Sequence, residues 1–200
     1  MSILNYGIGN TGSISNMLRK LRVSAEVIST PAAVVAARRL VLPGIGAFDA
    51  CVEALQNSGL REPVLEFAAA GRPLLGICVG MQMLTRGSEE GCLPGLGLIP
   101  AYTHRFTEQD GLRIPHMGWD HVRWLVPDHP LGRHLLQDSR FYFVHSFRVT
   151  CELPTNCLAV CSYGGEFAAA IGSGNITGVQ FHPEKSHRFG LQLLSNFATT

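Results

Sequence analysis

Apolar residues in the first half of the chain follow two kinds of spacing. Ile14, Met17, Leu18 and Leu21 recur at i, i+3, i+4 and i+7, which is typical of an amphipathic helix. Short apolar runs, typical of buried strands, lie at 2–6, 25–28, 40–42 and 73–77, and segments of helical character lie at 13–21, 31–37, 48–55 and 63–70. Strands that alternate with helices predict a parallel sheet covered by helices on both faces.

The second half of the chain consists of runs with strand character separated by Gly, Pro and Asn. These runs lie at 102–106, 121–125, 141–149, 157–162, 167–171 and 176–181, and a helical segment follows at 190–197. They predict antiparallel strands added to the sheet. Because no repeat or linker interrupts the chain, we expect a single domain over residues 1–200. Its fold class would be α/β, a three-layer sandwich with a mainly parallel central sheet.

The composition is that of a globular protein and narrows the possible functions. Hydrophobic residues make up 46% of the 200 positions and charged residues 16%, which is too apolar for intrinsic disorder. The net charge is +1, so we expect binding neither to nucleic acid nor to a membrane surface. No apolar run approaches the roughly 18 residues of a membrane span, and the start of the sequence lacks signal-peptide features. The sequence therefore predicts a soluble, cytoplasmic protein.

The cysteines give no sign of a metal site or a disulfide framework. Six are present, at positions 51, 78, 92, 151, 157 and 161, and none forms a C-x-x-C pair. Cys157 and Cys161 have no matching pair of ligands with zinc-like spacing elsewhere. We therefore expect free thiols, no metal and no cofactor.

One cysteine lies in a pattern typical of a nucleophile. Gly76-Ile77-Cys78-Val79-Gly80 follows an apolar run and is the cysteine version of the G-x-S-x-G nucleophile elbow. The glycines permit a strained turn that lifts the side chain out of the sheet, and a helix N-terminus next to the sulfur would favour the thiolate. The alternative is that Cys78 is a small buried hydrophobic residue.

Two further segments carry groups that such a nucleophile needs. His182 and Glu184 are two residues apart at the end of a predicted strand, so both side chains would lie on one side and the carboxylate could orient the imidazole. The loop around Gly44 and Gly46 leaves another strand, where an oxyanion donor is usually found, and could equally be an ordinary glycine turn.

A third glycine-rich segment supports a different function. Gly7, Gly9 and Gly12 form a G-x-G-x-x-G pattern between a predicted strand and a predicted helix, as in dinucleotide-binding proteins. The acidic residue expected at the end of the second strand is missing, since that strand ends Ile28-Ser29-Thr30. A tight turn that needs positive φ explains the glycines equally well. A nucleotide-binding module and a cysteine peptidase using Cys78 and His182 stay as alternatives.

Taken together, these motifs resemble the class I, or triad, glutamine amidotransferases over essentially the whole chain. The segments at 43–48, 76–82 and 178–186 carry the resemblance to the wider family. Pro-His-Met-Gly-Trp at 115–119 and Phe-Val-His-Ser at 143–146 are more specific, and they resemble the glutaminase subunit of imidazole glycerol phosphate synthase.

The resemblance implies a mechanism through a thioester. Cys78 would attack the side-chain amide of glutamine, His182 would act as general base and then acid, and Glu184 would orient the imidazole. The oxyanion would be bound by backbone N–H groups of Val79 and of the loop at Gly44 and Ile45. A small amino acid as substrate distinguishes this function from that of a peptidase.

The resemblance also implies binding residues and a partner. The positions that would bind glutamine are Gly46, Gln82, Glu90, Ser146 and Phe147, with Glu90 suited to the α-ammonium group. Ammonia would pass to a cyclase subunit, a (β/α)₈ barrel that forms a heterodimer with this chain and makes imidazole glycerol phosphate and AICAR in histidine biosynthesis. The positions that would face this partner are His116, Met117, Trp119 and Asp120.

Three residues depart from the usual family pattern. Asn5 stands where aspartate is usual, Asp120 where asparagine is usual, and Phe147 where tyrosine is usual. None belongs to the triad, so the departures bear on the partner and the acceptor rather than on glutamine hydrolysis. The segment at 186–190 resembles paralogues that supply ammonia for the amidation of cell-surface sugars, which is the alternative acceptor.

Overall fold

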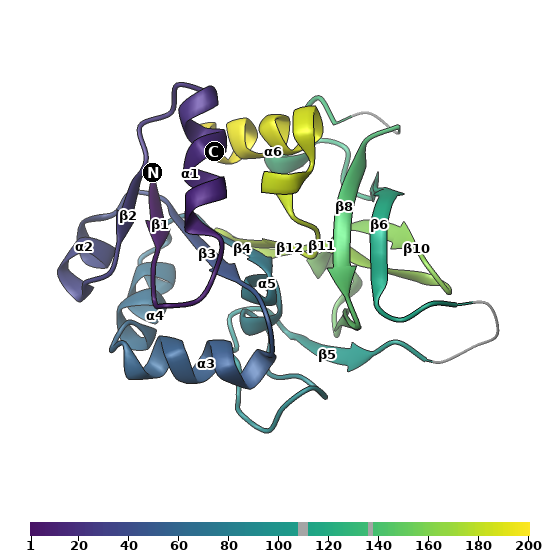
Figure 1. The fold of residues 1–200 in the computed structure, drawn as a ribbon, viewed down its shortest axis with the longest axis horizontal. Coiled ribbons are helices and arrows are strands. Elements are labelled where there is room, and N and C mark those ends of the chain that lie inside the picture. Colours follow the sequence, from purple (N-terminus) through teal and green to yellow (C-terminus); the bar gives the residue numbers. More distant parts are fainter. Residues whose placement is uncertain (108–111, 136–137) are drawn as a thin grey trace.

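The computed structural model describes residues 1–107, 112–135 and 138–200. Its centre is a parallel sheet in the order β2-β1-β3-β4-β12 (Figure 1). The strands are β1 (Ser2–Leu4), β2 (Glu26–Ile28), β3 (Leu40–Gly44), β4 (Leu74–Cys78) and β12 (Ile176–Val179). Every residue of β3, β4 and β12 is buried, as expected for strands covered on both faces.

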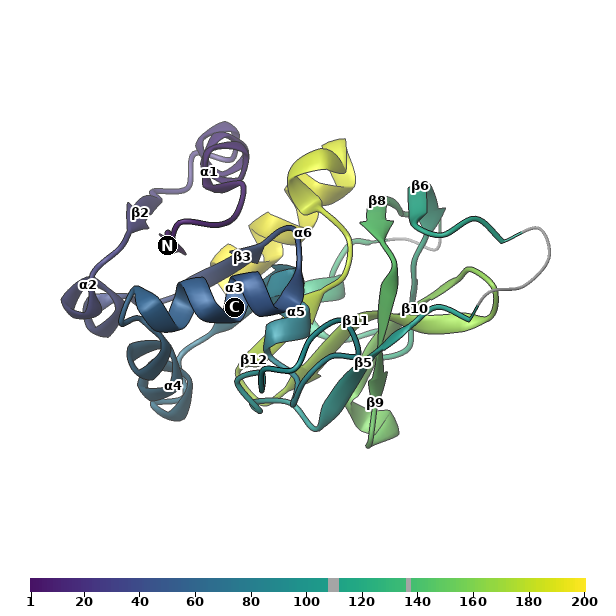
Figure 2. The same cartoon turned by 60° about the horizontal axis from the view of Figure 1, so that its bottom comes forward.

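Helices cover both faces of this sheet, as the alternating pattern predicted. One face carries α1 (Thr11–Lys20) and α6 (His187–Thr199), which contact each other. The other carries α2 (Pro31–Ala36), α3 (Phe48–Asn57), α4 (Arg61–Ala69) and the short α5 (Val79–Met83) (Figures 1 and 2). The α/β three-layer arrangement is therefore confirmed.

Antiparallel strands extend the sheet beyond β12, also as predicted. The extension contains β11 (Glu166–Ser173), β10 (Cys157–Ser162) and β7 (Arg123–Trp124) in that order, while β9 (Phe147–Cys151) pairs with both β11 and β5 (Ala101–Arg105). The chain closes with α6, whose buried face includes Leu193, Leu194 and Phe197.

Two strand predictions in this half were wrong in their extent. The run at 141–149 is divided at Ser146 into β8 (Arg140–His145) and β9, because the chain changes pairing partner there. The run at 121–125 misses most of β6 (His116–His121), which pairs with β8 in a separate two-stranded sheet (Figure 2). Gly118 lies inside β6 with φ of +139°, and a glycine in the middle of a strand whose ends are polar hides the strand from a pattern-based prediction.

The carboxyl ends of three neighbouring parallel strands meet at one point. Gly44 at the end of β3 pairs in register with Cys78 at the end of β4, and β12 ends three residues before His182 on the other side of β4. In α/β sheets, ligands bind outside the carboxyl ends of the strands. The predicted site residues therefore lie at the edge of the sheet where ligands usually bind.

Candidate active site

Cys78 occupies a strained turn between β4 and α5. Its φ and ψ of 55° and −115° are unusual for a residue with a side chain. Neither flanking glycine could carry a side chain: a Cβ on Gly76 would lie 2.6 Å from the carbonyl oxygen of Gly80, and one on Gly80 would lie 2.0 Å from that of Leu42. The predicted elbow is present, and both glycines are there because backbones approach closely.

The loop after β3 lies against this elbow. A Cβ on Gly44 would lie 2.4 Å from the backbone nitrogen of Gly80, so the end of β3 and the first turn of α5 are in backbone contact. The Cys51 thiol donates a hydrogen bond to the carbonyl oxygen of Ile45 at 3.2 Å and ties the loop to α3. The loop and the N-terminus of α5 therefore lie on two sides of the Cys78 sulfur.

His182 lies beside Cys78 and is supported from behind by Glu184. Its Nδ1 donates a hydrogen bond to Glu184 Oε1 at 2.8 Å, and the two side chains are 4% and 2% exposed. Burial alone lowers the pKa of His182, but hydrogen bonds and charge from Cys78 and Glu184 outweigh it and raise the pKa to about 9. The contacts with Cys78 and Glu184 therefore favour the protonated imidazole of His182.

The triad opens into a cavity of about 410 Å³ that gathers most of the predicted site residues. It is lined by Ile45, Gly46, Cys78, Val79, Gln82, Glu90, Ser146, Phe147 and His182, and also by Pro115, Val144, His145 and Lys185. Gly44 and Glu184 lie behind this lining. Glu90 Oε2 accepts a hydrogen bond from the N–H of Phe48, at the start of α3, which fixes the carboxylate.

Sequence reasoning missed Gln180, a fully buried residue of this site. Its Nε2 donates to the Cys78 sulfur at 3.9 Å, and its Oε1 accepts from Gln82 Nε2 at 3.1 Å. The strand predicted to run to residue 181 ends at Val179, and Glu184 lies in a 3-10 turn over Pro183–Lys185. The strand spacing assumed for His182 and Glu184 was therefore wrong, although their side chains do meet, and it could not have identified Gln180.

The residues assigned to a partner face all lie on β6. Met117 is 61% exposed and Trp119 42%, with its indole stacked on the His187 ring. Asp120 is half-buried. His116 is buried, so it could act on a partner only through the residues around it. The apolar exposure at Met117 and Trp119 is compatible with an interface.

The glycine-rich segment after β1 forms a tight turn. Gly7 and Gly9 have φ of +95° and +119°, and a Cβ on Gly9 would lie 2.8 Å from Pro43 Cγ. Asn10 caps α1 by accepting a hydrogen bond from the N–H of Ser13. Turn geometry and close packing therefore account for Gly7 and Gly9 without a bound nucleotide.

A cysteine on a strained turn, a buried histidine–glutamate pair just after the neighbouring strand and a cavity beside them define an α/β protein equipped for acyl transfer through a thioester. The family model of the class-I glutamine amidotransferases matches residues 2–200. The chain belongs to this family.

Relatives of more than 40% identity share a narrower description. Imidazole glycerol phosphate synthase subunit HisH 2 of Methanococcus maripaludis is 45% identical over 98% of both chains. The protein of the same name from Pseudomonas aeruginosa is 43% identical over 98% of this chain and 96% of its own. A crystal structure of a glutamine amidotransferase aligns with 100% of this chain and 99% of its own chain, with a TM-score of 0.75. The sequence identity is 17%, so this likeness shows a shared fold.

In the described part of the chain, no helix is long and apolar enough to cross a membrane.

The raised pKa of His182 leads to a testable pH dependence. In the Glu184→Gln variant the imidazolium loses its counter-charge, so its pKa falls and less thiolate forms at low pH. We expect alkylation of Cys78 by iodoacetamide at about pH 6.5 to slow by roughly tenfold for each unit of lost pKa, and the difference to vanish above about pH 10. Mass spectrometry of the Cys78 peptide measures the rate, and the exposed thiol of Cys92 is the internal control. Equal rates in both proteins at low pH would contradict the prediction.

Gln180 supplies a second prediction, in which two substitutions separate chemistry from packing. Gln180→Glu keeps the acceptor for Gln82 but replaces the N–H donor near Cys78 by a negative charge. Because hydrogen bonds to charged groups contribute about 1.5–3 kcal/mol, we expect Cys78 alkylation and kcat to fall roughly 10- to 100-fold. Gln180→Leu removes both contacts and should lower the free energy of unfolding as well. Unchanged alkylation rates in both variants would show that Gln180 only fills space.

Proposed function

We propose that this chain hydrolyses glutamine to glutamate and ammonia through a thioester on Cys78. The single observation that carries the proposal is the Cys78–His182–Glu184 arrangement at the floor of a cavity that also holds the Glu90 carboxylate. The cavity lies within the 300–1,000 Å³ range of small-molecule sites. Family membership supports the reaction class.

The reaction takes place in two steps. The Cys78 thiolate attacks the amide carbon, and the oxyanion receives hydrogen bonds from the N–H groups of Val79 and Ile45. His182 then gives its proton to the leaving nitrogen, ammonia departs and the thioester forms. Neutral His182 next takes a proton from water, hydroxide attacks the thioester, and glutamate leaves with the thiolate of Cys78 restored beside the protonated His182. Glu184 holds the imidazole in one tautomer throughout.

Glutamine recognition follows from the charges and the shape of the cavity. The Glu90 carboxylate is the negative group of the lining and would pair with the α-ammonium group of the substrate. Gly46, Gln82, Ser146 and Phe147 form the remaining contacts with the substrate.

The partner we propose is a (β/α)₈ cyclase subunit that binds as a heterodimer over the exposed side chains of β6. The names of the relatives support this partner, since they are synthase subunits of imidazole glycerol phosphate formation. In this proposal the whole chain, residues 1–200, is one glutaminase domain. It works in the cytoplasm, in histidine biosynthesis, where the synthase also releases AICAR.

A sugar amidated by a related partner is the second acceptor that we propose. It rests on the segment at 186–190, which resembles paralogues that supply ammonia for the amidation of cell-surface sugars.

The experiment measures glutamate release in three conditions: the chain alone, with a candidate partner, and with the partner and its acceptor. The peptide that supplies the Ile45 N–H joins Gly44 to Ile45, and the glycine eases rotation of this peptide. In this proposal the N–H points away in the free chain, which then lacks one oxyanion donor. We expect roughly 100-fold activation by the correct partner with its acceptor. Asp120→Asn should change this activation but not the triad. Full activity of the chain alone, unchanged by any partner, would overturn the proposal of a partner-dependent glutaminase.

A further inference from the structure

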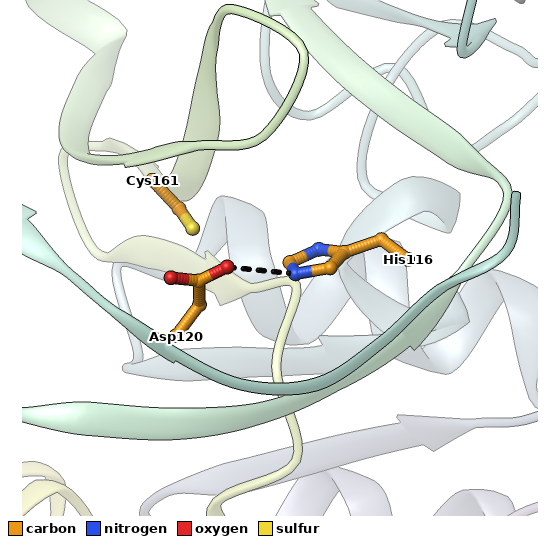
Figure 3. Close-up of side chains that lie close together, drawn as sticks. All are labelled: His116, Asp120 and Cys161. Carbon is orange, nitrogen blue, oxygen red and sulfur yellow. Dashed lines mark hydrogen bonds and ion pairs between the residues drawn. The ribbon is translucent and has the colours of Figure 1, made fainter. Parts of the chain in front are cut away.

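Three potential metal ligands converge beside the sheet formed by β6 and β8. His116 and Asp120 are four residues apart on β6, so both side chains lie on the same face, and Cys161 approaches them from β10 (Figure 3). His116 Nε2 lies 3.2 Å from Asp120 Oδ2, and one donor atom from each residue lies within 4.8 Å of the others. His116 and Cys161 are buried, and Asp120 is half-buried.

The His116 ring is held in one orientation before any ligand binds. It stacks on the Tyr163 ring at 3.9 Å and on the Phe143 ring at 4.8 Å. Its Nδ1 is hydrogen-bonded to His145 Nε2 at 3.2 Å, and His145 Nδ1 is bonded to the Phe147 carbonyl at 2.7 Å. The aromatic rings fix the plane, so Nε2 points at the Asp120 carboxylate.

The direction of this hydrogen-bond chain determines where the protons are. A carbonyl can only accept, so His145 Nδ1 carries a hydrogen and, in the neutral ring, its Nε2 accepts from His116 Nδ1. Nε2 of His116 and an oxygen of the Asp120 carboxylate therefore face each other at 3.2 Å, and either a proton or a metal cation between the two atoms satisfies both.

We propose that His116 Nε2, the Asp120 carboxylate and the Cys161 thiolate bind one Zn²⁺ ion. An imidazole nitrogen, a carboxylate oxygen and a thiolate are the ligands of tetrahedral zinc. Bond lengths of about 2.1 Å put nitrogen and oxygen ligands about 3.4 Å apart in a tetrahedron, close to the observed 3.2 Å. Binding displaces the proton of the Cys161 thiol to solvent, so one proton is released for each ion bound.

The surroundings provide what a zinc site requires. Histidine ligands of metals usually donate their other N–H to a fixed acceptor, and His145 is that acceptor here. Asp120, with a side chain 34% exposed, gives the ion a path from solvent and leaves the fourth position to water. His145 also lines the cavity of the triad, so the zinc site and the active site share this residue. The proposal does not depend on the identity of the ammonia acceptor.

The test uses Co²⁺ and Zn²⁺ with the full chain carrying Cys78→Ser, because Cys78 and His182 could themselves bind these ions. We expect one Co²⁺ per chain, with visible d–d bands of tetrahedral cobalt and a thiolate-to-cobalt charge-transfer band, and displacement of cobalt by Zn²⁺. In the same background, Cys161→Ser should remove the charge-transfer band, and Asp120→Asn should weaken Zn²⁺ binding at least about 100-fold.

The matched control is Cys157→Ser, which removes another thiol of β10 and should leave the bands unchanged. Circular dichroism shows whether each variant is folded, and Asp120→Asn restores the residue usual in the family, so misfolding is not expected. Two outcomes overturn the proposal: no tetrahedral cobalt spectrum in the parent protein, or a spectrum that survives Cys161→Ser and disappears in Cys157→Ser.

Discussion

Cys78→Ala is expected to abolish glutamine hydrolysis while the partner still uses added ammonia. In the proposed mechanism the sulfur forms the covalent intermediate, and Cys78 is the one thiol among the described residues that line the cavity. We expect a loss in kcat on the order of 10⁴- to 10⁶-fold. A glutamine-mimicking diazoketone should label one cysteine of the unmodified protein, and mass spectrometry should find the label on Cys78.

Replacing the other two members of the triad should rank their contributions. His182→Ala removes the general acid and base and should cost nearly as much as Cys78→Ala, because the triad acts as a unit. Glu184→Gln keeps a hydrogen-bonding group of the same shape and should cost roughly ten- to a hundredfold less. Labelling of Cys51, Cys92 or Cys151 instead of Cys78, or equal losses in the histidine and glutamate variants, would contradict these roles.

Gly80→Ala should damage both the fold and the activity, although it adds a single methyl group. The new Cβ would lie 2.0 Å from the Leu42 carbonyl oxygen and 3.2 Å from the Pro43 carbonyl carbon, which are backbone atoms of β3. The first turn of α5 must therefore move away from β3, and the Cys78 turn must move with it. We expect the free energy of unfolding to fall by about 3 kcal/mol or more, the upper end for an overpacked core.

The matched control is Gly12→Ala. Gly12 lies inside α1, its φ is not positive and a Cβ there meets no atom within 4 Å. Alanine favours the helix at this position, so the control should gain about 0.5–1 kcal/mol of stability and keep full activity. Denaturant unfolding and glutamate release measure both variants. A Gly80→Ala protein with unchanged stability would show that the close contact between β3 and α5 does not constrain the elbow.

The parts of this molecule that the sequence predicted are those governed by local rules. Alternation of apolar runs and helical spacing is a short-range signal, and it identified the parallel sheet and its two helical layers. The elbow at Gly76-Ile77-Cys78-Val79-Gly80 was predictable because the motif is contiguous and its glycines are needed where backbones approach closely. His182 and Glu184 are close in the sequence, which was enough to single them out, although they meet in the turn after β12 and not on a strand.

The features that escaped prediction depend on contacts between distant segments. The division at Ser146 arises because β8 pairs with β6 while β9 pairs with β5, and no local pattern records a change of pairing partner. Cys161 meets His116 and Asp120 only after β6 folds over β10, which the spacing of cysteines along the chain cannot show. An expectation of no metal site, based on spacing alone, is insensitive to such a cluster.

The pairing of β6 with β8 outside the main sheet has an evolutionary consequence. The nucleophile and its backbone contacts belong to strands of the central sheet, where added atoms are not tolerated at Gly44, Gly76 or Gly80. Residues that face outward on β6, such as Met117 and Trp119, belong to an independent pair of strands and can change without moving that backbone. After gene duplication, one copy can thus acquire a new docking surface at β6 while the inherited chemistry of the triad is preserved.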